Sequence, residues 1–187
     1  LLFGRNDPAF SGQVAWRTIV PAPRGMPSEA RVHMAGGRHL VSYPLRRGAG
    51  PPSVVNIVAV QETETWSAEG WHHADAPENL RAAFADAAPP VAALLERVTL
   101  VHRWGLFERQ VPGLWHRGRI GLIGDAVHPT LPFLAQGANL AMEDAWVLAE
   151  CLSRAAPAPE ALDAAWGDFT RRRHARVLRA VRAARGN

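Results

Sequence analysis

The sequence predicts a mixed fold of the α+β or α/β class. The first half is expected to form an antiparallel sheet. The second half is expected to form the last strand and closing helices of an α/β domain whose beginning is not present. Two observations predict this. Through residues 13–61, short stretches rich in β-branched and aromatic residues alternate with Gly or Pro clusters, as in strands joined by turns. After Pro77 the apolar residues recur every three or four positions, which is helical spacing.

Four strands are expected in the first half, at residues 13–20, 30–35, 39–46 and 53–61. The pair Gly36-Gly37, between the second and third of them, is a short hairpin signal. Because links of hairpin length join antiparallel neighbours, these strands indicate an antiparallel sheet rather than βαβ units.

The second half is expected to be mainly helical. Helical spacing covers residues 78–87 and 90–97, strand character returns at 98–107, and a short, buried apolar strand follows at 119–123. Two further helices are expected at residues 137–152 and 159–185.

Composition excludes several classes of protein. The chain of 187 residues has one cysteine, so a disulfide framework is impossible, and no apolar run approaches the roughly 20 residues of a membrane-spanning helix. The N-terminus shows no basic region typical of a signal peptide. We therefore expect a cytoplasmic protein that does not act at a membrane.

The positive charge is concentrated at the C-terminal end. All 21 basic residues are arginine, and seven of them lie in residues 171–185; the remaining 14 face 17 acidic residues. A solvated basic face is the favoured interpretation of this helix. Contact with another domain or a second subunit, as in a homodimer, is an alternative. Nucleic-acid binding is disfavoured because the rest of the chain is slightly acidic.

Residues 118–151 carry the strongest candidate site. The apolar strand ends at Gly124, and Asp125 follows at its carboxyl end, where open α/β sheets bind ligands. A proline-stiffened loop then leads to residues 136–139, which open a helix. Free N–H groups at a helix N-terminus favour an anion or a polarised carbonyl.

This segment resembles the second FAD-binding motif of the single-component FAD-dependent aromatic hydroxylases, the family of salicylate hydroxylase. The matching positions are Gly124-Asp125-Ala126-Val127-His128-Pro129, Pro132, Ala135-Gln136-Gly137-Ala138-Asn139, Ala141, Glu143-Asp144-Ala145 and Leu148-Ala149. Similarity also covers Ala15-Trp16-Arg17, Tyr43-Pro44-Leu45-Arg46 and Trp104-Gly105-Leu106-Phe107.

The resemblance implies a bound FAD, NADH or NADPH as co-substrate, and O2 as the oxidant that hydroxylates a small, electron-rich aromatic compound. Asp125 would bind the ribityl or pyrophosphate side of FAD. The backbone of residues 137–139 would face the pyrimidine edge of the flavin ring. The implied cofactor-binding residues are Gly124, Asp125, Pro132, Gln136, Gly137, Ala138 and Asn139.

Other side chains are candidates for substrate chemistry. His39 and Tyr43 lie four apart on an expected strand and so share a face; we expect both to line the substrate pocket and His39 to take the phenolic proton. Phe133 would shape an apolar part of that pocket. Arg17 and Arg109 could each hold a substrate carboxylate, although surface ion pairing is the plainer interpretation of any single arginine.

A metal site is not expected, because Asp125 and His128 have no third ligand at suitable spacing. The sequence also lacks the G-x-G-x-x-G motif with which the family begins. We therefore expect the C-terminal half of such an enzyme, with a substrate-binding sheet region at residues 1–112 and the end of the FAD-binding domain at 113–187. A missing N-terminal Rossmann half would be its partner. The alternative is a non-catalytic fragment or interaction module unable to hold FAD alone.

Overall fold

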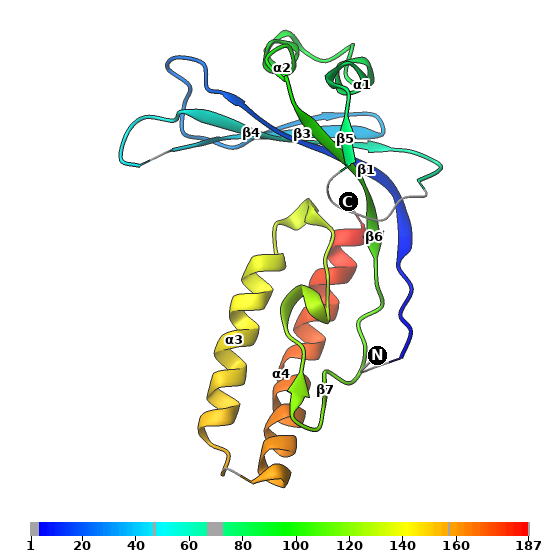
Figure 1. Ribbon diagram of the computed structural model, residues 1–187, viewed down its shortest axis with the longest axis vertical. Helices are drawn as coiled ribbons and strands as arrows, with labels where there is room; N and C mark the ends of the chain where they lie inside the picture. The colour runs from blue at the N-terminus through cyan, green and yellow to red at the C-terminus, as the bar shows by residue number, and fades with distance from the viewer. Residues whose placement is uncertain (1–3, 47, 67–72, 157, 187) are drawn as a thin grey trace. The chain divides into compact units, whose positions relative to one another are not determined.

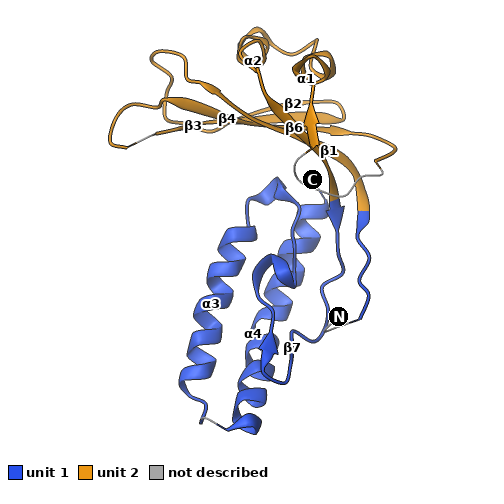
Figure 2. Cartoon of the chain, viewed as in Figure 1, with its two compact units in different colours: residues 1–9, 107–187 blue, residues 10–106 orange. Residues whose placement is uncertain are grey.

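The computed structural model describes residues 4–46, 48–66, 73–156 and 158–186. The chain divides into two compact units, residues 10–106 and residues 1–9 with 107–187 (Figures 1 and 2). We call them the sheet unit and the helical unit. The division into domains after residue 112 stays a prediction. Within the described ranges, no helix combines the length and apolar character needed to cross a membrane.

The sheet unit contains a six-stranded sheet in the order β2-β3-β4-β1-β6-β5. Its strands are β1 (Ala9–Pro21), β2 (Arg31–Ala35), β3 (Arg38–Leu45), β4 (Val54–Glu62), β5 (His73–Asp75) and β6 (Val101–Glu108). The pairings β2–β3, β3–β4, β1–β4 and β5–β6 are antiparallel, which confirms the predicted antiparallel sheet. The first strand pairs with β4 rather than with β2, because a long connection over residues 22–30 separates β1 from β2.

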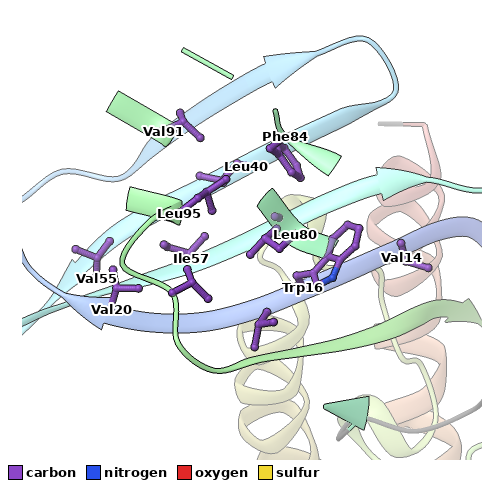
Figure 3. Close-up of a cluster of buried hydrophobic side chains, with 13 residues drawn as sticks. Val14, Trp16, Val20, Leu40, Val55, Ile57, Leu80, Phe84, Val91 and Leu95 are labelled. Atoms are coloured by element: carbon purple, nitrogen blue, oxygen red, sulfur yellow. The ribbon is translucent and has the colours of Figure 1, made fainter. Parts of the chain in front are cut away.

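One face of this sheet packs against two short helices, α1 (Pro77–Ala83) and α2 (Pro89–Leu95). Each helix begins with proline in its first turn, where the missing N–H would have no partner in any case. Trp16, Leu40 and Ile57 from the sheet meet Leu80 and Leu95 from the helices (Figure 3). Burying each such side chain contributes about 1.5–3 kcal/mol.

The helical unit consists mainly of two long helices that pack against each other, α3 (Gly137–Ser153) and α4 (Pro159–Arg185), as Figure 1 shows. Both were expected within one residue of these bounds. Ahead of them lie β7 (His116–Arg117), β8 (Ile120–Gly121) and two short 3-10 turns, η1 (Gly124–Ala126) and η2 (Pro132–Leu134).

The expected buried strand at residues 119–123 is wrong in its extent and burial. Gly118, with φ +58°, turns the chain back so that only Ile120 and Gly121 pair, and they pair with β7 in a two-stranded hairpin. Ile120 is 57% exposed. Among the described residues β7 is the one strand that pairs with β8, and the Trp166 ring packs against Gly121.

The arginine-rich helix α4 is largely neutralised by carboxylates of its own unit. Five of its seven C-terminal arginines, all within residues 158–186, form ion pairs: Arg171, Arg172, Arg173, Arg176 and Arg185. Their partners come from α3, from α4 itself and from the end of β6. The charge that looks like a solvated basic face in the sequence therefore lies mostly in contacts within the unit.

Candidate functional site

The turn at Gly124 requires glycine for two reasons. Its φ of +58° lies in the left-handed region, and a Cβ placed on it would lie 3.0 Å from the Cβ of Ala141 in α3. The carbonyl of Gly124 accepts hydrogen bonds from the N–H groups of Val127 and His128, at 3.0 and 2.9 Å. The backbone thus closes tightly on α3 and turns Asp125 outward, where its side chain is exposed.

A buried carboxylate holds this turn from beneath. Asp144 of α3 is fully buried and accepts hydrogen bonds from the Gly124 N–H (2.9 Å), from His128 Nε2 (2.6 Å) and from Arg173 Nε (2.8 Å). Burial alone would raise the pKa of Asp144, but the three hydrogen bonds outweigh it and hold that pKa below its ordinary value. Asp144 is therefore an anion that ties the turn, the following loop and α4 together.

A second layer surrounds the buried carboxylate. Arg173 of α4 is 5% exposed and also pairs with Glu143 at 2.6 Å, and Arg176 reaches the same Glu143 at 3.1 Å. The ring of Trp115 packs on the imidazole of His128 with centroids 5.2 Å apart. His128 Nε2 is therefore engaged by Asp144, and its ring packs within this network.

Sequence reasoning missed Asp144 and Arg173 as site residues, although a signal was present. Asp144 lies between Leu140 and Cys151 on the stripe that α3 buries, and Arg173 lies between Phe169 and Val177 on the stripe that α4 buries. A charge on an apolar stripe needs an opposite charge, because an unpaired buried ion is very costly. When two neighbouring helices each carry such a charge, of opposite sign, the two side chains are expected to pair.

Above the network, the exposed carboxylate of Asp125 lies beside the N-terminus of α3. A Cβ placed on Gly137 would lie 3.6 Å from Asp125 Oδ1 and 3.3 Å from Thr130 Oγ1, so the glycine lets both side chains approach the start of the helix closely. The first intrahelical hydrogen bond joins Leu140 N–H to the Gln136 carbonyl at 2.9 Å. The N–H groups of residues 137–139 precede it and have no intrahelical acceptor.

This corner fits a flavin. The carboxylate accepts hydrogen bonds from hydroxyl groups such as those of a ribityl chain. The helix N-terminus donates N–H groups and carries partial positive charge, which suits the polarised carbonyls of the ring's pyrimidine edge. Gly124, Asp125, Gln136 and Gly137 thus lie together, and their role in binding the cofactor stays a prediction.

The loop that joins the two parts contains Pro132, Phe133 and Ala135. Pro132 is exposed and Phe133 half-buried in η2, and Ala135 adopts a left-handed conformation with φ 50° and ψ 32°. The structure places Pro132 in the loop leading to α3 rather than in the corner itself. The role of Phe133 in a substrate pocket stays a prediction.

His39 and Tyr43 belong to the sheet unit. They pair across β3–β4 with Val60 and Asn56, which places both on the sheet face opposite α1 and α2. Their shared face follows from the register, as their spacing predicts, while their catalytic and substrate-binding roles stay predictions. Burial lowers the pKa of His39, which favours the neutral imidazole that can accept a proton.

Arg109, which the sequence offers as a ligand for a substrate carboxylate, and Cys151, the single cysteine, have other surroundings. Arg109 donates a hydrogen bond to the backbone carbonyl of Asn6 in the same unit. Cys151 is buried, and burial together with its contact to Asp168 raises the pKa of its thiol, which disfavours the reactive thiolate. Among the described residues, no group of three or more His, Cys, Asp or Glu side chains could hold a metal ion.

Comparison with known proteins decides the family. The FAD binding domain family matches residues 20–184. The chain belongs to this FAD binding domain family. FAD is therefore its cofactor, and the resemblance carried by residues 124–149 is confirmed.

The chain is similar to 3-amino-4-hydroxybenzoate 2-monooxygenase PtnB3 of Streptomyces platensis. The two are 40% identical over 155 residues, which cover 80% of this chain and 38% of the relative. The 6-hydroxynicotinate 3-monooxygenase of Pseudomonas fluorescens is 37% identical over 156 residues, 81% of this chain and 40% of the relative. The chain thus spans less than half the length of these curated relatives.

Solved structures share the fold. HpxO of Klebsiella pneumoniae, complexed with FAD and uric acid, superposes with a TM-score of 0.82 at 24% identity, covering 97% of this chain and 45% of HpxO. A salicylate hydroxylase substrate complex gives a TM-score of 0.79 at 24% identity, covering 96% of this chain and 47% of that one.

Proposed function

We propose that this chain supplies the ring-facing part of the flavin site and the substrate sheet of an FAD-dependent monooxygenase. The enzyme would use NADH or NADPH and O2 to hydroxylate a phenolic or otherwise electron-rich aromatic compound. The observation that carries this proposal is the corner where the Asp125 carboxylate lies beside the open N-terminus of α3, in a chain of the FAD binding domain family. The named relatives act on aromatic acids.

The residues of the helical unit would bind and orient the flavin. Asp125 would accept hydrogen bonds from the ribityl hydroxyls, and the N–H groups of residues 137–139 would donate to the pyrimidine edge. Bound FAD supplies the electrons that activate O2 for insertion of one oxygen atom into the ring. Negative charge on the reduced ring would lie at the helix N-terminus, which stabilises it electrostatically.

The buried network would fix this geometry in advance. Asp144 holds the Gly124 N–H on one side and α4 on the other, so the direction in which Asp125 leaves the turn is set before any ligand binds. Pre-organised donors and acceptors of this kind stabilise developing charge without rearranging.

The residues of the sheet unit would handle the substrate. His39 would accept the phenolic proton at an imidazole nitrogen, because its lowered pKa keeps the ring neutral and able to act as a base. Tyr43 would hydrogen-bond to the same end of the substrate. Removing the phenolic proton raises the electron density of the ring, which favours hydroxylation.

The proposal is tested by nuclear magnetic resonance on the 15N-labelled chain. The sequence contains no G-x-G-x-x-G motif, so the contacts expected of this chain alone are weak and are made to the ring and ribityl group rather than to adenosine. Riboflavin, FMN and FAD should therefore shift the amide signals of residues 137–139 with similar millimolar affinity.

Asp125→Ala should weaken the binding of all three flavins about 10-fold or more, because it removes a hydrogen bond to a charged group. Asp7→Ala, which removes another exposed carboxylate of the same unit, is the matched control and should change nothing. Flavin-induced shifts that avoid residues 124–139, or that persist unchanged in Asp125→Ala, would contradict the proposal and favour a non-catalytic interaction module.

A further inference from the structure

The face of the sheet that packs on α1 and α2 holds an arginine between two tryptophan rings. Arg103 follows Val101 by two positions on β6, and Val101 belongs to the cluster that packs on the helices, so both side chains point to this face. The guanidinium carbon of Arg103 lies 4.6 Å from the ring centroid of Trp16, which is labelled in Figure 3, and 5.1 Å from that of Trp66. Arg103 is therefore on the other side of the sheet from His39.

Gly105, two residues further along β6, lets the second ring approach. A Cβ placed on Gly105 would lie 2.2 Å from Trp66 Cδ1 and 2.7 Å from Trp66 Nε1, so a side chain there would displace the indole. The ring of Trp66 also meets that of His73 on β5 edge-on, with centroids 6.1 Å apart. The faces of tryptophan rings attract a cation, so the two indoles orient the guanidinium of Arg103 between them.

The N–H groups of this guanidinium lack acceptors. Nε of Arg103 is buried and has no hydrogen-bond partner, and no carboxylate within residues 4–46, 48–66, 73–156 and 158–186 forms an ion pair with the side chain. Arg103 as a whole is half-buried, so Nη1 and Nη2 form its accessible end. Buried polar groups in native proteins are almost always hydrogen-bonded. This arginine therefore calls for an acceptor that the described residues do not supply.

A carboxylate lies close enough to act on this charge, but other groups use it. Asp75 Oδ2 accepts a hydrogen bond from Trp16 Nε1 at 2.7 Å, and Asp75 Oδ1 accepts one from the Ala76 N–H at 2.9 Å and one from Asn79. Burial alone would raise the pKa of Asp75, but these hydrogen bonds and, more weakly, the charge of Arg103 hold that pKa below its ordinary value. Asp75 is therefore an anion engaged elsewhere, which leaves the N–H groups of Arg103 unpaired.

We propose that Arg103, held between Trp16 and Trp66, binds a small oxyanion, a carboxylate or a phosphate, on the face of the sheet that packs on α1 and α2. The planar guanidinium presents two parallel N–H groups that match two oxygens of either anion. The negative charge of Asp75 opposes the ligand, so we expect millimolar affinity. A ligand here would be an effector that leaves the face of His39 and Tyr43 open, and the inference does not rest on the proposed monooxygenase function.

The test is a titration of the 15N-labelled chain with sodium phosphate and, separately, with sodium acetate. The pH is fixed and the ionic strength is held constant with sodium chloride. Both anions should shift the Nε–H signal of Arg103 and the indole N–H signals of Trp16 and Trp66, and the shifts should saturate. The anion that saturates them at the lower concentration tells whether a phosphate or a carboxylate is the preferred group.

Four variants, followed at the indole signals, make the test specific. Arg103→Gln should weaken both anions about 10-fold or more, because hydrogen bonds to charged groups are lost. Arg103→Lys keeps the charge but not the planar pair of N–H groups and should bind with intermediate affinity. Asp75→Asn keeps an acceptor for Trp16 and removes the opposing charge, so it should bind both anions more tightly. Arg24→Gln, which changes an exposed arginine of the same unit, is the matched control and should change nothing.

Two results would overturn the inference. One is a set of shifts that grow linearly with phosphate, acetate and chloride alike, which is a general effect of salt. The other is an unchanged affinity in Arg103→Gln or, if that variant does not fold, in Arg103→Lys. These readouts all lie in the sheet unit, whereas the proposed monooxygenase function is read from the flavin-induced shifts of residues 137–139, so the failure of one proposal is distinguished from the failure of the other.

Discussion

The two units are stabilised by different kinds of core. In the sheet unit the buried cluster between the sheet and the two short helices is apolar, built around Trp16, Leu40 and Ile57. In the helical unit the apolar cluster around Trp115 and Phe169 adjoins a buried ion cluster. The buried acidic and arginine side chains among the described residues, Asp144 and Arg173, both belong to the helical unit. The comparison shows that the polar core lies directly under the turn that carries Asp125.

The difference has an energetic meaning. An apolar core is non-directional, and its side chains can be exchanged for others of similar volume at modest cost. A buried ion cluster is directional and depends on every member, because removing one partner leaves an uncompensated charge. The buried side chains of the sheet unit can therefore be exchanged at modest cost, whereas the ion cluster of the helical unit fixes the direction in which Asp125 leaves its turn.

The largest expected effect comes from breaking the ion cluster. Asp144→Ala removes one of the two carboxylates that pair with the buried Arg173 and leaves the Gly124 N–H without an acceptor, which should destabilise the helical unit by about 3–5 kcal/mol. Amide hydrogen exchange in α3 measures this effect. Glu150→Gln, which removes a surface ion-pair partner on the same helix, should destabilise the unit much less, because solvent screens exposed ion pairs. Equal effects of the two substitutions would show that the buried cluster contributes no more to stability than a surface ion pair.

A smaller effect is expected at the glycine of the turn. Gly124→Ala combines a left-handed backbone with a contact of 3.0 Å to Ala141 and should cost about 2–4 kcal/mol. Gly118 has the same φ of +58° but open space around it, so Gly118→Ala should cost only about 1–2 kcal/mol. Urea unfolding followed by circular dichroism gives both values. If the two variants are equally destabilised, the packing of the turn against α3 contributes nothing.

The smallest expected effect concerns His39 in the sheet unit. Burial lowers the pKa of its imidazole, so its titration by nuclear magnetic resonance should have a midpoint below the ordinary value of about 6.5. Between that value and the lowered pKa, the unfolded chain binds a proton that the folded chain does not, so stability falls as the pH falls. His39→Gln should flatten this part of the pH profile. A midpoint at or above the ordinary value would contradict burial of the imidazole.

Local patterns in the sequence predicted most of the fold. The bounds of α3 and α4 were predictable because long helices show their spacing over many turns. The first four strands were predictable from their β-branched residues. Neither β5 nor the true extent of β8 could be predicted, because strands of three and two residues carry too few positions for a pattern.

The candidate site was predictable in part. Asp125 and residues 136–139 lie in one contiguous motif, whereas Asp144 and Arg173 are 29 residues apart, and each local pattern shows only a charge on an apolar stripe. The contacts of Arg103 with Trp16 and Trp66 likewise join residues far apart in the chain.

Ala135 has a consequence for the energetics of the loop that enters α3. A non-glycine residue with φ 50° is about 1–2 kcal/mol less favourable than one in the right-handed region, and it persists where the surrounding structure determines it. The rest of the helical unit therefore holds this loop in one conformation, and the loop carries that energetic cost as part of the fold.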